Sequence, residues 1–186
     1  MQRTRSDRRI GFWVGLCVLF IALVFVDQIT KIAFKNLYFS TGGKTVVIEG
    51  FFYFTFTENS GSAFSFLAGV WWGQIFFKIL TVIALVAFTW LLIRAVKKDK
   101  KFLAFGLVII IGGTVGNFID RLAFDKVRDF IGFTFGNYNF AIFNLADVFL
   151  TVGVIMLLVH YLFLDEGAVF KKKNENEKKD NGNDQG

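Results

Sequence analysis

Five aspartates lie beside or inside the apolar stretches of this 186-residue chain: Asp27, Asp120, Asp125, Asp129 and Asp147. Ionisable groups in such places are energetically costly and usually mark function. Two carboxylates held close together do not both ionise easily, so one of them keeps a proton. The ionised member can take a proton from water while the protonated member donates one to a carbonyl oxygen. A pair of these aspartates can therefore hydrolyse a peptide bond without a metal or a nucleophilic side chain.

The residue types alone do not select the pair. Asp147 is the hardest to explain structurally, because it lies inside an apolar stretch. Asp120 precedes Arg121, so an ion pair or a helix-end cap explains it equally well. Asp125 lies among basic residues and fits a solvated loop charge, and Asp27 can simply end its helix. All five remain candidates at this point.

Other reactive side chains are scarce. The single cysteine, Cys17, lies in an apolar run, which excludes an intramolecular disulfide and a cysteine-based metal site. The single histidine, His160, lies near the end of the last apolar run with no nucleophile nearby, and we interpret it as a helix-end residue near the lipid headgroups. We expect neither a metal nor another cofactor.

The composition indicates a membrane protein. Hydrophobic residues make up 54% of the chain and aromatic residues 18%, and the mean hydropathy is +0.53. A soluble domain of this size needs more polar residues to cover its surface. Four windows approach the roughly 20 apolar residues that a membrane span requires. They cover residues 10–26, 70–93, 102–119 and 141–164. No small-residue cleavage site follows the first, so we expect it to be retained as an anchor.

Charge predicts how these spans are oriented. The segment before the first span has four arginines and one aspartate, for +3, and the loop 94–101 has five basic residues and one acidic residue, for +4. Segments 27–58 and 120–140 each balance three against three. Basic loops face the cytoplasm, so both termini are expected inside, with segments 27–69 and 120–140 outside. Membrane orientation also explains the net charge of +6 better than nucleic-acid binding does.

The expected fold class is an all-α membrane fold with four transmembrane helices, a small extracytoplasmic β region and a short interfacial helix. Residues 44–57 are rich in β-branched and aromatic side chains and predict one or two strands at the membrane surface. Residues 61–68 are apolar but too short to span, which favours the interfacial helix. One domain is expected over 1–170, followed by a disordered charged tail, 171–186.

Polar residues gather at the outer level of the predicted spans. Asn144 and Asp147 lie one turn apart and share a helix face, whereas Asp129 is expected in the loop after the third span. The remaining members of this outer group are Asp27, Lys78, Asn117, Asp120 and Arg121. The glycines at 112, 113 and 116 fit close helix packing better than a phosphate loop.

Five motifs carry a family resemblance. They are DQITK (27–31), NSGSAF (59–64), GGTVGNFIDR (112–121), VRDFI (127–131) and FNLAD (143–147), with Gly153 further on. In this order and spacing, over about residues 26–153, the chain resembles the lipoprotein signal peptidases, also called signal peptidase II. The stretch 132–142 departs from the family's usual pattern.

The resemblance implies an aspartic endopeptidase of the bacterial inner membrane, with its active site near the outer leaflet. Such enzymes remove signal peptides from diacylglyceryl-modified prolipoproteins, cutting just before the lipobox cysteine. It implies Asp129 and Asp147 as the catalytic residues, contact with membrane lipids, and inhibition by globomycin. We expect a monomer. The substrate-binding or supporting residues implied are Asp27, Lys31, Asn59, Gly61, Asn117, Asp120, Arg121, Asn144 and Ala146.

Two other functions would also use polar residues inside a membrane. A small proton-coupled transporter with Asp147 as the carrier predicts acids near the bilayer midplane and internal repeats, and the sequence has neither feature. A non-catalytic membrane assembly factor would use the polar residues to join helices, but it does not require two aspartates at one level.

Overall fold

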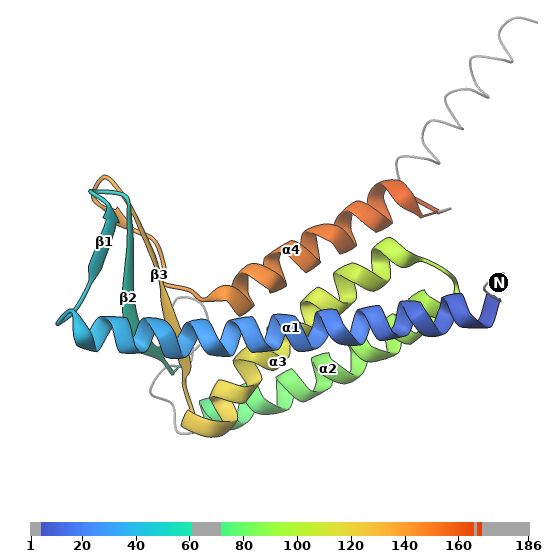
Figure 1. Cartoon of the computed structure of the whole chain (residues 1–186), viewed down its shortest axis with the longest axis horizontal. Helices are drawn as coiled ribbons and strands as arrows, with labels where there is room; N and C mark the ends of the chain where they lie inside the picture. Colours follow the sequence, from blue (N-terminus) through green and yellow to red (C-terminus); the bar gives the residue numbers. More distant parts are fainter. Residues whose placement is uncertain (1–4, 61–71, 166, 169–186) are drawn as a thin grey trace, which may run out of the picture.

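Four helices form the body of the protein in the computed structural model, which describes residues 5–60, 72–165 and 167–168. All four are long and apolar enough to cross a membrane, judged by length and composition. They are shown in Figure 1 and comprise α1 (Arg5–Ser40), α2 (Gly73–Lys97), α3 (Lys101–Phe124) and α4 (Leu145–Val159), the last continued by the π-helical turn η2 (His160–Leu164).

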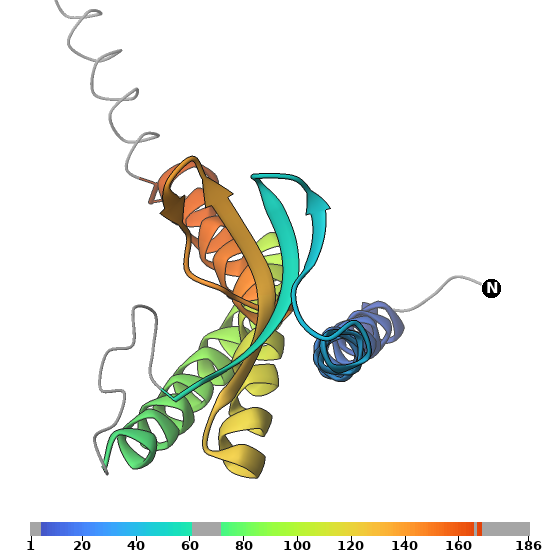
Figure 2. The ribbon, with the colours of Figure 1, turned by 90° about the vertical axis from the view of Figure 1, so that its left-hand side faces the viewer.

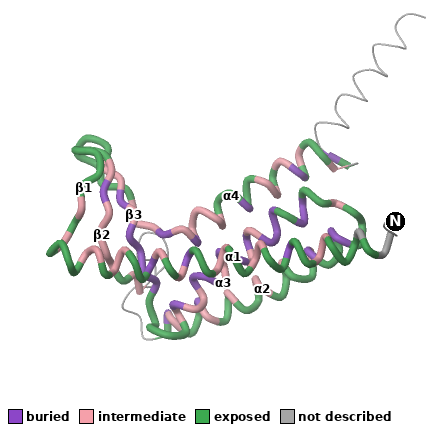
Figure 3. Tube along the Cα trace, in the orientation of Figure 1, coloured by how far each residue is buried: buried purple, intermediate pink, exposed green. Residues whose placement is uncertain are grey.

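Helix α3 is the centre of this arrangement, because it packs against α1, α2 and α4. Its buried residues include Ala104, Leu107 and Ile110, all fully shielded. The other helices turn apolar side chains outward: Ile21 of α1, Val86 of α2 and Leu158 of α4 are each more than half exposed (Figure 3). Water would not favour such a surface, but lipid does.

A four-stranded antiparallel sheet with the order β1-β2-β3-β4 lies at the end of the helices away from the N-terminus (Figures 1 and 2). Its strands are β1 (Thr45–Ile48), β2 (Phe52–Asn59), β3 (Val127–Phe135) and β4 (Tyr138–Asn139). The sheet therefore joins two chain segments that flank different helices.

The last turns of α1 hold this sheet in place. At 1.5 Å per residue, the 36-residue helix is about 54 Å long, well beyond a hydrocarbon core of about 30 Å. Phe34 lies between Phe54 of β2 and Phe130 of β3, with ring centroids 4.1 and 4.5 Å away. The extension of α1 beyond its apolar window thus becomes a support for the strands.

Residues 44–57, for which one or two strands were predicted, form β1 and most of β2. The interpretation of Asp27 as a helix end is wrong, because α1 continues to Ser40. The helix can continue past Asp27 inside the protein because Lys31, one turn later, neutralises the charge of the Asp27 carboxylate. The expectation that Asp129 lies in a loop is also wrong, because it lies on β3. Residues 127–130 are all buried, so the alternation that normally reveals a strand is missing.

The remaining helix boundaries shift modestly. The described part of the second apolar window forms a helix only from Gly73, α3 runs through Asp120 to Phe124, and α4 starts at Leu145 rather than 141. The predicted helix at 61–68, the site residue Gly61 and the predicted tail at 171–186 lie outside the described residues.

Glycines allow α3 and α4 to approach closely, as expected for a packing role. A Cβ atom on Gly113 would lie 2.5 Å from the Ala146 carbonyl oxygen, and one on Gly153 would lie 2.5 Å from Ile110 Cγ1 and 2.8 Å from the Gly106 carbonyl oxygen. These separations leave no room for a methyl group.

We therefore expect Gly153→Ala to destabilise the protein by about 1–3 kcal/mol, the usual result of overpacking, and to lower the midpoint of thermal unfolding in detergent. The matched control is Gly15→Ala on α1, where nothing lies within 4 Å of the added methyl group. Equal midpoints for the two variants would contradict the packing role of Gly153.

Candidate active site

The backbone of Phe143 brings two of the predicted aspartates together. Its carbonyl oxygen accepts hydrogen bonds from the N–H groups of Phe130 (3.0 Å) and Ile131 (2.8 Å), and its own N–H donates to the Ile131 carbonyl (3.1 Å). The chain just before α4 is thereby fixed alongside β3. As a result, Asp129 on β3 and Asp147 in the first turn of α4 face the same region.

Asn144 links the start of α4 to β3. Its side-chain oxygen accepts from the Asp147 N–H, while the Asp147 carboxylate accepts from the Asn144 N–H, which together form a capping box. The Asn144 Nδ2 group donates to Asp129 Oδ1 at 2.6 Å. One asparagine therefore orders the helix start and contacts both aspartates.

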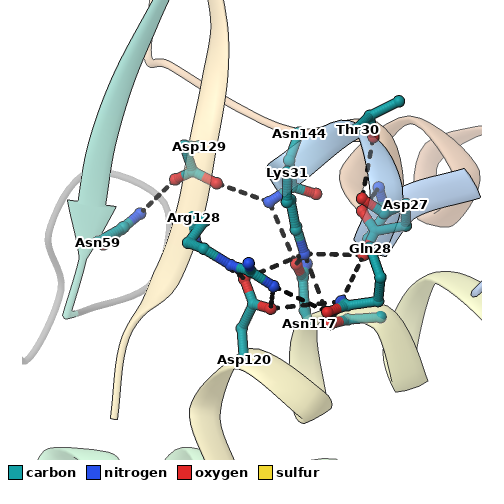
Figure 4. A network of polar contacts seen from close by, with 12 residues as sticks. Asp27, Gln28, Thr30, Lys31, Asn59, Asn117, Asp120, Arg128, Asp129 and Asn144 are labelled. Atoms are coloured by element: carbon teal, nitrogen blue, oxygen red, sulfur yellow. Dashed lines mark hydrogen bonds and ion pairs between the residues drawn. The ribbon is translucent and has the colours of Figure 1, made fainter. Parts of the chain in front are cut away.

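Two further asparagines orient the carboxylates. Asn59, the last residue of β2, donates to Asp129 Oδ2 at 3.2 Å (Figure 4). Asn117 of α3 donates to Asp147 Oδ1 at 2.8 Å. Asp129 and Asp147 are thus both held by amide donors, which fix the direction of a carboxylate without neutralising its charge.

A cavity of about 600 Å³ opens onto both aspartates. Its polar lining residues are Asn59, Asn117, Arg121 and Thr151 as well as the two acids. The rest of its wall is apolar and comes from β3, the segment before α4 and α4 itself: Val127, Phe140, Ala141, Ile142, Phe143, Val148, Leu150 and Val152. This cavity can hold an apolar chain next to a pair of acids.

The environment favours the protonated form of Asp129. Burial, together with the nearby negative charge of Asp147, raises the pKa of Asp129 to about 7, although the amides of Asn144 and Asn59 and the charge of Lys31 act in the opposite direction. A carboxyl group that holds its proton near neutral pH can serve as a general acid.

Near Asp129 lies a polar cluster, which we define as Asp27, Gln28, Lys31, Asp120 and Arg128 (Figure 4). Its four charged members are buried. Lys31 Nζ lies 2.9 Å from Asp27 Oδ2 and 3.3 Å from Asp120 Oδ2. The Arg128 guanidinium lies 2.6 Å from Asp120 Oδ1 and also donates to Gln28 Oε1 at 2.8 Å. Buried charges of both signs compensate one another here.

Most of the predicted site residues lie at the cavity or contact the residues that line it or the polar cluster. Asn59, Asn117, Arg121, Asp129 and Asp147 line the cavity. Asn144 donates to Asp129, and the buried Ala146 donates its N–H to Asp27. The catalytic and binding roles that the sequence suggested for them remain predictions.

Three details differ from expectation. Asp120 does form an ion pair, but with Lys31 and Arg128 rather than with Arg121. Arg121 instead reaches the cavity, with its guanidinium carbon 5.6 Å from the centre of the Phe77 ring. Asp125 is exposed at the end of α3, as expected for a loop charge, and pairs with Lys78 at 2.6 Å.

The sequence reasoning missed Arg128 and Gln28. Arg128 directly precedes Asp129, and neighbouring residues of a strand point in opposite directions. If β3 had been predicted, Arg128 would have been expected to point away from Asp129 and toward α3. Gln28 gives no comparable signal. Among the described residues, no three His, Cys, Asp or Glu side chains gather as metal ligands would.

Comparisons with known proteins identify the family. The family model described as signal peptidase (SPase) II matches residues 19–163. A lipoprotein signal peptidase of Listeria monocytogenes serotype 4a is 41% identical over 147 residues, covering 78% of this chain and 91% of that protein. One from Bacillus pumilus is 40% identical over 146 residues, covering 78% and 90%.

A solved structure described as a bacterial membrane enzyme, at 2.3 Å resolution, matches with a TM-score of 0.64 and 33% identity, covering 83% of this chain and 94% of that one. These matches support a membrane peptidase over a transporter or an assembly factor. The chain belongs to the signal peptidase II family and is a multi-pass bacterial membrane peptidase of the aspartic type.

Proposed function

We propose that Asp129 and Asp147 form the catalytic pair of this peptidase. The observation that carries the proposal is that both carboxylates open into one cavity and both are held by Asn144, one through its amide and one through its backbone. Two carboxylates that share a cavity and are oriented by hydrogen bonds meet the requirement for activating a water molecule between them.

In this mechanism Asp129 holds the shared proton and Asp147 is ionised. A water molecule between them loses a proton to Asp147 while its oxygen attacks the scissile carbonyl carbon, and Asp129 donates its proton to the carbonyl oxygen. The tetrahedral diol then collapses as the C–N bond breaks. The proton on Asp147 passes to the leaving nitrogen, and one diol hydroxyl returns a proton to Asp129, which restores the starting pair. Arg121 lies within electrostatic range of both acids and lines the same cavity, so its positive charge can stabilise the negative charge that moves between them.

The substrates are diacylglyceryl-modified prolipoproteins, cut just before the lipidated cysteine. The related proteins are named lipoprotein signal peptidases, and the family implies prolipoprotein substrates. The apolar wall of the cavity, formed in part by Ile142, Val148 and Leu150, suits an apolar signal peptide or an acyl chain. The wall residues Phe140–Ile142 lie in the stretch that departs from the family pattern, so we assign them a part in choosing among signal peptides.

The active site and the sheet lie on the outer side of the membrane, near the outer leaflet, and both termini are cytoplasmic. The basic turn between α2 and α3 lies at the opposite end of the helices from the sheet, and basic segments favour the cytoplasmic side (Figure 1). Residues 1–170 form one peptidase domain. The peptidase works as a monomer in contact with lipids, and globomycin-type inhibitors occupy the cavity.

Asp129→Asn and Asp147→Asn should each lower the cleavage rate by at least about 10²–10⁴-fold, because each removes one proton-transfer group. The test uses purified protein in detergent or lipid with a diacylglyceryl-modified prolipoprotein, and follows the cleaved product on a gel. Asp125→Asn is the matched control, since its carboxylate is exposed and pairs with Lys78 away from the cavity. Wild-type rates in both Asp129→Asn and Asp147→Asn would exclude the mechanism.

The pH dependence should report the shared proton. Below pH 7 Asp129 keeps the proton that the mechanism needs, and above pH 7 the proton is lost, so kcat/KM should fall as the pH rises through about 7. Asn59→Leu removes a donor that lowers the pKa of Asp129, so this fall should move to higher pH. The measurement uses a substrate that does not titrate between pH 5 and 9. A flat profile over that range would contradict the role of Asp129 as the acid.

A further inference from the structure

Lys31 has an unusual environment for a lysine. Its side chain is fully buried, and its amino group contacts three different polar side chains: Asp27 at 2.9 Å, Asp120 at 3.3 Å and Asn117 at 3.0 Å. Burying an ammonium group costs several kcal/mol unless its partners are well placed. Lys31 itself is not among the residues that line the cavity.

Two of these contacts lead to the residues that directly precede the proposed catalytic acids. Asp27 Oδ1 accepts a hydrogen bond from the Ala146 N–H at 3.0 Å, and Ala146 is followed by Asp147. Asp120 accepts from the Arg128 N–H at 2.9 Å and from its guanidinium at 2.6 Å, and Arg128 is followed by Asp129. Lys31 attracts the carboxylates of Asp27 and Asp120. It therefore links the two hydrogen bonds that hold the backbone just before Asp147 and just before Asp129.

The third contact orients an amide. A lysine ammonium group can only donate, so it fixes the oxygen of Asn117 toward itself. The Asn144 amide also donates to that oxygen, at 3.1 Å. The NH₂ group of Asn117 must then point the other way, where it donates to Asp147 Oδ1 at 2.8 Å. Lys31 and Asn144 together ensure that a donor, rather than an acceptor, faces Asp147.

We propose that Lys31 is the positioning residue of the aspartate pair, fixing the separation of Asp129 and Asp147 through Asp27 and Asp120 and the hydrogen bonding of Asp147 through Asn117. The inference rests on the proposed function of the two acids. Helix α1 then sets the geometry of the reaction, although α1 contributes no reacting group.

Replacing Lys31 by methionine keeps most of the side-chain volume and removes the charge. Asp27 and Asp120 then repel each other, and their hydrogen bonds to the Ala146 and Arg128 N–H groups shift. The Asn117 oxygen loses one of its two donors and keeps only the Asn144 amide, so the hydrogen bond from Asn117 to Asp147 is less firmly oriented. A misplacement of about 1 Å can slow catalysis about 10²-fold. We therefore expect kcat to fall by about 10–100-fold, whereas KM should change by less than about threefold because Lys31 does not line the cavity.

The experiment measures kcat, KM and the pH profile for the full chain in detergent or lipid, using a diacylglyceryl-modified prolipoprotein. The charged groups acting on Asp129 are Asp147 of α4, Lys31 of α1 and Arg121 of α3. Without the charge of Lys31, which lowers the pKa of Asp129, the alkaline fall in kcat/KM should move to higher pH. Lys31→Arg keeps the charge and should recover part of kcat and the original profile.

The matched control is Lys100→Met, which removes another ion pair, with Asp165 at 2.8 Å, at the other end of the bundle. It should leave kcat and the pH profile unchanged. Lys31→Met with wild-type kcat and profile would overturn the inference, as would a loss of kcat equal to that of Lys100→Met.

If Lys31→Met does not fold, the double variant Asp27→Asn with Lys31→Met replaces it, because it removes one buried charge of each sign. A folded double variant with wild-type kcat would overturn the inference, and one with reduced kcat and near-normal KM would support it. The proposed function is tested separately. Activity in Asp129→Asn and Asp147→Asn would exclude the dyad, whereas inactivity there with a normal Lys31→Met would exclude only the positioning role.

Discussion

The attraction between Lys31 and the carboxylates of Asp27 and Asp120, all fully buried, is the interaction on which this structure depends. It joins α1 to α3, and through Arg128 and Ala146 it reaches β3 and α4. Buried ion pairs are not efficient sources of stability, because apolar side chains of similar volume often do as well. Their value lies in specificity, since every charged or polar group in such a cluster needs its partners in defined places.

The two halves of the helical bundle meet different physical demands. Near the α2–α3 turn the core is made of Leu16, Leu92, Leu107 and their neighbours, which pack without polar groups. At the sheet end, the core is a network of acids, amides and basic groups. Hydrogen bonds and ion pairs are directional in a way that apolar contacts are not, so the functional groups lie where the geometry is most constrained.

The sequence predicted the overall organisation well because its strongest signals are local. Apolar run length revealed four helices, and Asp147 stood out because a charge inside such a run has no simple structural explanation. The β3 strand could not be predicted, since Val127–Phe130 are buried on both faces and have no alternation. The partners of Asp120 were missed for a related reason, because Lys31 and Arg128 reach it through tertiary contacts that sequence spacing does not encode. Asp27 was wrongly expected at a helix end because its charge is neutralised by Lys31, one helical turn later, rather than by water.

The length of α1 has a consequence for how the protein responds to its membrane. From Arg9 to Lys31 the helix rises by about 33 Å, close to the thickness of a hydrocarbon core of about 30 Å. The same rigid helix carries Lys31 and, further on, the sheet. A thicker or thinner bilayer is accommodated by tilting helices or deforming lipid. Any such tilt moves the acids and the sheet together relative to the headgroups. With the catalytic pair proposed above, the depth at which a substrate is cut then depends on the surrounding lipids as well as on the residues of the enzyme.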